Sequence, residues 1–432
     1  MKIGGRLAAA IEVIAALETQ HRPASQALAD WGRAHRFAGS GDRSAIGSLV
    51  YDVLRKRSSL AAQMGSDTPR ALVLAATRHA FAMSVDDIAA AADGSEHAPA
   101  PLTEDERERL SRPLAADTPP EIAADVPAWL APSLQRAFGD RLFEEGRALA
   151  ERAPVDLRAN ALKADRDKVL KALARFDATP TPISPLGVRI AAPAGSAKAP
   201  HVEAETSHGK GWFEVQDEGS QIAAALAGAG PRQQVLDLCA GAGGKTLAMA
   251  GAMQNTGQIY AYDSDRRQLR PIFERMKRAG VRNVQVLDGG DEDALKALGA
   301  RFDVVFIDAP CTGSGTWRRR PDSKWRLKPE ALEQRQQDQA AVLELASTLV
   351  KSGGRLVYVT CSLLPEENGD RVAAFLAEHA EFTLKPYAEV WRERMGTEPP
   401  ASADGGSGGL LLTPASHGTD GFYIATLVRK SP

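Results

Sequence analysis

The sequence contains no long apolar run and no recognisable leader, and both absences narrow the class of protein. No stretch approaches the roughly 18 apolar residues that a membrane-spanning helix needs. The first ten residues, Met1–Ala10, lack the basic and then apolar order of a signal peptide. We therefore expect a cytoplasmic protein with no membrane partner.

Cysteine is scarce. Cys239, Cys311 and Cys361 are an odd number of thiols in a chain of 432 residues, which argues against a disulfide framework and for reduced cysteines. The eight histidines show no H-x-x-x-H spacing and the cysteines no C-x-x-C spacing, so no metal site is expected. Thiol chemistry therefore stays available.

An excess of charge of either sign is also lacking. The formal net charge of -2 excludes a uniformly basic protein that coats nucleic acid, so any contact with nucleic acid must come from local clusters. The length and the 44% apolar content predict two or three domains, each with its own core.

Four segments follow from the patterns along the chain. Residues 1–92 have helical periodicity and predict an all-α domain. Residues 93–126 are rich in Pro, Ala, Asp and Glu and predict a linker that sustains no helix. Residues 127–220 predict a small α/β module. Residues 221–432 alternate strands and helices, which predicts an α/β domain with a mostly parallel, doubly wound sheet. Its expected strands are Val235–Leu238, Ile259–Tyr262, Val284–Leu287, Val304–Ile307, Leu356–Val359 and Phe422–Leu427.

A glycine-rich turn follows the first of these strands. A P-loop would need glycine at Cys239, and a dinucleotide fingerprint would need glycine or alanine at Thr246, so neither motif fits fully. The order strand, Asp237, three residues, Gly241, one residue, Gly243 is the usual first motif of S-adenosylmethionine-dependent methyltransferases. A purely structural glycine turn is the alternative. The motif predicts S-adenosyl-L-methionine as the cofactor.

Acidic residues end the next two strands. Asp263 stands twenty residues after Gly243, where a carboxylate can accept hydrogen bonds from both ribose hydroxyls. Asp288 ends the third strand and is the predicted partner of the adenine amine, with Asp291 as a competitor. The predicted cofactor-binding residues are Cys239, Ala240, Gly241, Ala242, Gly243, Gly244, Lys245, Asp263, Asp288 and Asp308.

Two of the cysteines each follow a strand closely. The segments Asp308-Ala309-Pro310-Cys311 and Thr360-Cys361-Ser362 come directly after the fourth and fifth strands of the predicted sheet. The carboxyl ends of parallel strands line the ligand crevice, so both thiols and Asp308 are expected to converge beside the cofactor. A buried cysteine is often only a small apolar residue, an interpretation that suits Cys239 best.

These segments resemble signatures of the Nop/Sun (RsmB-like) family of RNA cytosine-C5 methyltransferases. The resemblance extends over roughly the last half of the chain, with Arg158–Lys163 similar to the small RNA-binding module of that family. The first hundred residues resemble a NusB-like RNA-binding domain more weakly. Further segments that resemble the Nop/Sun family are Phe213–Gln221, Leu364-Pro365-Glu366-Glu367-Asn368 and His417–Tyr423. The segments that resemble the NusB-like domain are Gly41–Ser44 and Leu49–Arg55.

The resemblance implies the catalytic roles. Cys361 would add to C6 of the base and so activate C5 toward the methyl donor. Asp308 would hydrogen-bond the base at N3 and at the exocyclic amine. Cys311 would help to release the product, and Lys245 would orient Asp308 and lower the pKa of a nearby thiol.

A basic, tryptophan-containing segment follows the Cys311 loop and predicts RNA contact, although a solvated basic face is the alternative. The target base would have to be unstacked or flipped. Small-subunit ribosomal RNA is the preferred substrate, transfer RNA the second, and we expect a monomer. A DNA cytosine methyltransferase and a catalytically silent RNA-binding factor are the competing functions. The predicted RNA-binding residues are Trp317, Arg318, Arg319, Arg320, Lys324, Trp325 and Arg326.

Overall fold

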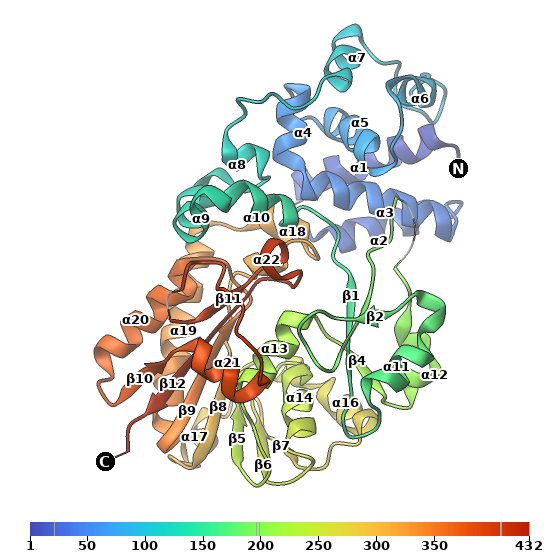
Figure 1. Ribbon diagram of the computed structural model, residues 1–432. Coiled ribbons are helices and arrows are strands. Elements are labelled where there is room, and N and C mark those ends of the chain that lie inside the picture. The colour runs from blue at the N-terminus through green and yellow to red at the C-terminus, as the bar shows by residue number, and fades with distance from the viewer. Residues whose placement is uncertain (21, 196, 198, 407, 432) are drawn as a thin grey trace.

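The chain folds into a helical part, a small four-stranded sheet and a larger sheet flanked by helices (Figure 1). The computed structural model describes residues 1–20, 22–195, 197, 199–406 and 408–431. In Figure 1 the helical part is blue to cyan, the small sheet teal to green and the large sheet yellow-green to red. Within the described residues, no helix is long and apolar enough to cross a membrane.

The N-terminal part is all helical, as the periodicity predicts. Its core is formed by apolar side chains spaced three and four residues apart, with Leu7 and Ile14 on one helix facing Leu49, Leu72 and Leu74 on others. Its helices are α1 (Ile3–Gln20), α2 (Ala24–Ala34), α3 (Ser40–Arg55), α4 (Arg57–Met64), α5 (Pro69–Ala80), α6 (Val85–Ala91) and α7 (Glu104–Ser111).

Helix α7 corrects the expectation that residues 93–126 sustain no helix. The Thr103 side chain accepts a hydrogen bond from the Glu106 backbone, and the Glu106 carboxylate accepts one from the Thr103 backbone. This capping box satisfies two backbone donors and starts the helix despite the prolines before it. Leu110 is fully buried in the core of the helical part, so the segment packs on that part.

The next helices connect the helical part to the large sheet. They are α8 (Pro120–Ala123), η1 (Ala128–Leu130), α9 (Ala131–Phe138), η2 (Gly139–Arg141) and α10 (Leu142–Leu149). Leu134, Phe138 and Leu142 belong to the same hydrophobic core as strand residues of the large sheet. Amphipathic periodicity marks the apolar face of a helix but does not identify the surface that covers it. The sequence therefore places α8 in the linker and the helices after it in the small module.

The small sheet is antiparallel and has the order β2-β3-β1-β4. Leu157, Val188 and Phe213 form its core together with Val169 from a helix that packs on one face. Its elements are β1 (Val155–Ala159), α11 (Arg166–Ala172), η3 (Ala174–Phe176), β2 (Thr179–Pro180), β3 (Gly187–Ile190), η4 (Val202–Ala204), α12 (Thr206–Gly209) and β4 (Phe213–Val215).

The large sheet has the order β10-β12-β9-β8-β5-β6-β7, with β11 paired to β12. Strands β7, β6, β5, β8 and β9 are parallel, whereas β12 runs antiparallel to β9. The predicted doubly wound α/β fold is confirmed. Its strands are β5 (Gln234–Asp237), β6 (Gln258–Ala261), β7 (Val284–Val286), β8 (Phe302–Asp308), β9 (Val350–Thr360), β10 (Phe382–Lys385), β11 (Leu410–Leu412) and β12 (Phe422–Arg429).

Helices cover both faces of this sheet, which explains its nearly continuous apolar strands. Val305 and Ile307 of β8 face one core, while Val304 and Phe306 face the other. The helices, including short 3-10 turns, are α13 (Glu218–Leu226), α14 (Gly244–Ala252), α15 (Arg266–Leu269), α16 (Ile272–Ala279), α17 (Glu292–Lys296), η5 (Ser314–Thr316), α18 (Pro321–Arg326), α19 (Pro329–Leu349), η6 (Pro365–Glu367), α20 (Gly369–Glu378), α21 (Tyr387–Met395) and α22 (Pro414–His417).

Candidate active site

The glycine-rich turn joins β5 to α14 at the carboxyl edge of the large sheet. Gly243 has a φ of +81°, a conformation that glycine adopts without strain. A Cβ atom at this position would stand 2.4 Å from a side-chain carbon of Ile272. Only glycine therefore allows α16 to pack so closely against the turn, which leaves backbone groups of the turn facing the cavity.

Asp263 follows β6 and braces this turn. One carboxylate oxygen accepts a hydrogen bond from the Gly241 backbone at 3.0 Å, and the other accepts one from the Asp265 backbone at 2.9 Å. Each oxygen retains a lone pair for a further donor. The residue lies where the sequence predicts a ribose ligand, and the neighbouring Tyr262 also faces the cavity.

Asp237, the last residue of β5, is a buried acid whose role the sequence leaves unassigned. Its Oδ2 atom accepts a hydrogen bond from the Thr246 hydroxyl at 2.6 Å. Its Oδ1 atom is buried and has no partner among the described residues. Burial raises the pKa of Asp237 to about 7. An acceptor of this kind beside the cavity suits a cationic ligand.

The cavity beside the turn has a volume of about 700 Å³. Eight of the ten predicted cofactor residues line it, namely Cys239, Ala240, Gly241, Ala242, Gly244, Lys245, Asp263 and Asp308. Gly243 shapes the turn without lining the cavity. Residues that sequence reasoning missed include Gln216, Ser220, Asp237, Tyr262, Arg275, Glu292, Arg335 and Asp338.

The predicted adenine partner lies elsewhere. Asp288 does not line the cavity, is largely exposed, and forms a 2.6 Å ion pair with Arg266. Asp291 caps α17 by accepting a hydrogen bond from the Ala294 backbone. Glu292, next in the chain, lines the cavity instead. The loop after β7 turns the Asp288 carboxylate toward solvent in this structure, so its contact with adenine stays a prediction.

Cys311 and Cys361 lie together, as predicted. Their Sγ atoms are 3.3 Å apart, and both residues are partly buried. The reason is that β8 and β9 are parallel neighbours, so the loops after their carboxyl ends meet. The Gly315 backbone N–H donates to the Cys361 carbonyl at 2.9 Å and ties the two loops.

Burial and neighbouring groups shift the pKa values of several residues at and near the thiol pair. The hydrogen bond to Cys361, together with burial, raises the pKa of Cys311 well above its ordinary value, so Cys311 is a protonated thiol at neutral pH. Lys245 Nζ stands 2.6 Å from Asp308 Oδ2. Burial opposes the charge of Lys245, but the carboxylate of Asp308 outweighs that effect and raises its pKa. Burial also raises the pKa of Cys239, as expected for a turn residue without a catalytic role.

Three of the seven predicted RNA-binding residues, Trp317, Arg318 and Lys324, are buried against other parts of the chain, whereas Arg319, Arg320 and Arg326 are exposed. Trp317 is 1% exposed, and Arg318 pairs with Asp217 and Asp420. Lys324 donates hydrogen bonds to the backbone carbonyls of Arg55 and Asp125.

The Trp325 indole donates to the Leu54 carbonyl at 2.5 Å. Direct RNA contact is therefore corrected for Trp317, Arg318, Lys324 and Trp325, whose polar or aromatic groups are engaged inside the protein. Helix α18 lies between the helical part and the large sheet (Figure 1). Arg319 also pairs with Asp217 and Asp420, at 32% side-chain exposure.

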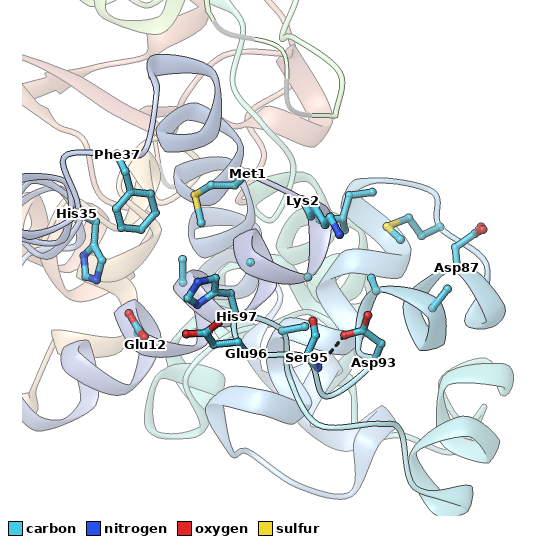
Figure 2. A pocket seen from close by; sticks show the side chains of 18 of the residues that line it. Met1, Lys2, Glu12, His35, Phe37, Asp87, Asp93, Ser95, Glu96 and His97 are labelled. Carbon is cyan, nitrogen blue, oxygen red and sulfur yellow. Dashed lines mark hydrogen bonds between the residues drawn. The ribbon is translucent and has the colours of Figure 1, made fainter.

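A larger cavity, of about 1230 Å³, lies in the helical part, remote in the chain from the thiols. Figure 2 shows His35 and Phe37 on one side of it and Asp93, hydrogen-bonded to the Ser95 backbone, on another. Its lining contains no cysteine and mixes acidic, basic and apolar side chains. Size alone does not make it the reaction site, because eight of the ten predicted cofactor residues line the smaller cavity instead.

Comparison with known proteins accords with this geometry. The family model described as 16S rRNA methyltransferase RsmB/F matches residues 224–428, and that of the RsmF/B-like ferredoxin-like domain matches residues 126–196. The chain is 32% identical over 305 residues to the "Probable ribosomal RNA small subunit methyltransferase B" of Synechocystis. It is 34% identical over 307 residues to ribosomal RNA small subunit methyltransferase B of Klebsiella pneumoniae. Each alignment covers 70% of the chain and 66% of the relative.

The chain belongs to the RsmB/F methyltransferase family. This confirms the Nop/Sun resemblance, and the cofactor of this family is S-adenosyl-L-methionine. Among solved structures, PH0851 matches with a TM-score of 0.72 at 25% identity over 99% of each chain. NSun6 from Pyrococcus horikoshii with SFG matches with a TM-score of 0.62 at 22% identity, over 71% of this chain and 99% of that one, and so supports the fold.

The cavity of this RsmB/F family member fits the cofactor. Its partnerless Asp237 oxygen faces a site suited to a cation, the glycine turn gives close backbone approach, and Asp263 has acceptors free for hydroxyl groups. Asp237, Asp263 and Glu292 are among the acidic residues that line this cavity and are available to accept hydrogen bonds from the cofactor. Among the described residues, no cluster of side chains is suited to bind a metal ion.

Proposed function

We propose that this RsmB/F family member methylates C5 of a cytosine in small-subunit ribosomal RNA. The observation that carries the proposal is the pair of thiols 3.3 Å apart on the loops that follow β8 and β9, with Asp308 at the end of β8 lining the cofactor cavity. Methylation of an ordinary nucleophile needs no thiol. Cytosine C5 must first be activated by a covalent thiol adduct at C6, and a second thiol can then help to release the methylated base from that adduct. The names of the aligned relatives support ribosomal RNA as the substrate class.

The residues would act in order. The Cys361 sulfur donates an electron pair to C6 of the cytosine, and the displaced double-bond electrons make C5 nucleophilic. Asp308, whose carboxylate Lys245 holds at 2.6 Å, accepts a hydrogen bond from the exocyclic amine as the base gains electron density. When bound, S-adenosylmethionine supplies the electrophilic methyl group.

Release follows the transfer. The C5 proton passes to water, its electron pair re-forms the double bond, and the C6–S bond breaks with its pair returning to Cys361. Cys311 is protonated and lies within contact of that sulfur, so its S–H can donate a hydrogen bond to the departing thiolate. The structure thus supports unequal roles for the two cysteines.

Substitution of each thiol tests these roles. The Cys361→Ala protein should form no covalent complex with RNA and no 5-methylcytosine. The Cys311→Ala protein should accumulate a covalent protein–RNA complex, visible as a shifted band on a denaturing gel. Adduct formation that survives the loss of Cys361 would reverse the assignment. It would favour the arrangement of DNA cytosine methyltransferases, in which the cysteine of the Pro-Cys motif, here Cys311, is the nucleophile.

Bisulfite sequencing of RNA from a deletion strain tests the substrate. A lost signal in small-subunit ribosomal RNA supports the proposal, and a loss confined to transfer RNA replaces it with the second substrate. If every signal persists and calorimetry detects no binding of S-adenosylmethionine, the chain is an RNA-binding factor without catalytic activity.

A further inference from the structure

Glu367 is a buried carboxylate that the mechanism above does not use. It ends η6, directly after the strand and loop that carry Cys361, and its side chain is fully buried. A buried carboxylate is costly to maintain unless its oxygens are hydrogen-bonded. The identity of its donors therefore indicates what the charge stabilises.

The donors come from both thiol loops. The Thr312 backbone N–H donates to Glu367 Oε1 at 2.9 Å, and the Thr312 hydroxyl donates to Oε2. The Ser362 hydroxyl also donates to Oε2. Thr312 follows Cys311 in the chain and Ser362 follows Cys361, so one carboxylate holds the residue after each thiol.

The remaining contacts make this bridge rigid. Gln339 of α19 donates to Glu367 Oε1 at 3.0 Å and to the Pro310 carbonyl at 2.9 Å. The Ser362 hydroxyl accepts a hydrogen bond from the Leu364 backbone, so its own hydrogen is directed to Glu367. All four groups that reach the carboxylate donate and so stabilise its ionised form, whereas burial acts against them and raises the pKa of Glu367.

We propose that Glu367 is a positioning residue that holds the Cys311 and Cys361 loops together, so that both thiols reach the same cytosine. It touches neither cofactor nor base in this arrangement and acts through Thr312 and Ser362. The catalytic consequence rests on the proposed function, whereas the geometric consequence does not.

The charge of Glu367 has a second effect. The hydrogen bond to Cys361 and burial are the main causes that raise the pKa of Cys311, and the negative charge of Glu367 adds to them. Removing this charge should make Cys311 easier to ionise. The charge of Glu367 therefore adds to the effects that raise the pKa of Cys311.

Oxidation of the full-length protein without RNA tests the geometry. Diamide accepts two electrons and two protons from two neighbouring thiols, and peptide mapping then measures the Cys311–Cys361 disulfide over time. We expect Glu367→Ala to slow this reaction at least tenfold and Glu367→Gln to slow it less. Glu366→Gln is the matched control, because Glu366 binds Ser133 and Arg136 instead and should leave the rate unchanged.

Two further measurements separate positioning from a general loss of structure. The pH profile of Cys311 alkylation should move down by about one pH unit in Glu367→Gln, and kcat for methylation should fall at least tenfold with KM for RNA unchanged. If Glu367→Ala fails to fold, the Gln variant carries the test through the alkylation profile, since it preserves side-chain volume.

The results separate the two proposals. Oxidation rates and alkylation profiles identical in wild type and Glu367 variants would overturn the positioning role, even if the wild type methylates RNA. If the wild type methylates no cytosine but the Glu367 variants are oxidised more slowly, the positioning role is supported and the proposed function is refuted.

Discussion

Replacement of Asp237 by Asn should separate folding stability from cofactor affinity. Asp237 is 1% exposed, and burial raises its pKa from 3.8 to about 7. The folded protein therefore binds this proton more tightly than the unfolded chain, and stability falls as pH rises from about 4 to about 7. The difference between the two pKa values lowers the free energy of unfolding by roughly 4 kcal/mol above pH 7.

In the Asp237→Asn protein no ionised carboxylate is buried at this position, so this loss of stability disappears, but the hydrogen bond from Thr246 becomes weaker. A hydrogen bond to a charged group contributes about 1.5–3 kcal/mol, so the net gain in the free energy of unfolding at pH 8 is roughly 1–3 kcal/mol. Urea unfolding of the cofactor-free protein at pH 5 and pH 8 measures it. The gain should be small at the lower pH, where the wild-type carboxyl is already protonated.

Cofactor affinity should change in the opposite direction. A cationic ligand binds the ionised form, whose share rises about tenfold between pH 6 and pH 8 for a pKa of about 7. Calorimetry with S-adenosylmethionine should show wild-type affinity rising by that factor, and weaker, pH-independent binding by Asp237→Asn. Asp288→Asn, a control outside the cavity, should match the wild type. A wild-type affinity that stays constant over this range would refute the reasoning.

Three further substitutions test other parts of the structure. Gly243→Ala should weaken cofactor binding at least tenfold in calorimetry, because its φ of +81° and the nearby Ile272 exclude a Cβ atom. Trp325→Ala should lower the free energy of unfolding by roughly 3 kcal/mol in urea, since the indole packs on the helical part. Arg320→Ala and Arg326→Ala, at exposed positions, should each reduce the salt dependence of RNA binding by roughly 0.7–0.9 in log–log slope, as measured by fluorescence anisotropy.

Strong periodicity and strand order made much of the large sheet predictable. All six strands expected from apolar runs exist, and their parallel order follows from alternation with helices. The sequence does not predict strands β10 and β11, which pair with β12 at the antiparallel side of the sheet, outside the alternation of strands and helices. Helix α7 was missed because proline content outweighed the capping box at Thr103 and Glu106.

The site was predictable where it depends on strand ends and not where it depends on loop direction. Cys311, Cys361 and Asp308 converge because their strands are parallel neighbours. After β7, by contrast, a shift of a few residues decides whether Asp288 or Glu292 faces the cavity, and apolar patterning does not specify that direction.

In the segment after the Cys311 loop, amino-acid composition alone could not distinguish an RNA-binding surface from an interface between parts of the same chain. Arginine and tryptophan suit RNA, but they equally suit buried contacts, where a planar cation or a large ring forms several bonds. Their partners here, Asp217, Asp420 and Leu54, lie about 100 residues or more away in sequence.

This arrangement links the helical part to the thiols through a short stretch of chain. Gly315 is hydrogen-bonded to the Cys361 carbonyl, and Trp317, two residues later, is buried. Trp325, eight residues beyond, is then anchored to the end of α3 through the Leu54 carbonyl. The helical part and the loop that carries Cys311 are thus joined through a stretch of about ten residues that is held at both ends by hydrogen bonds.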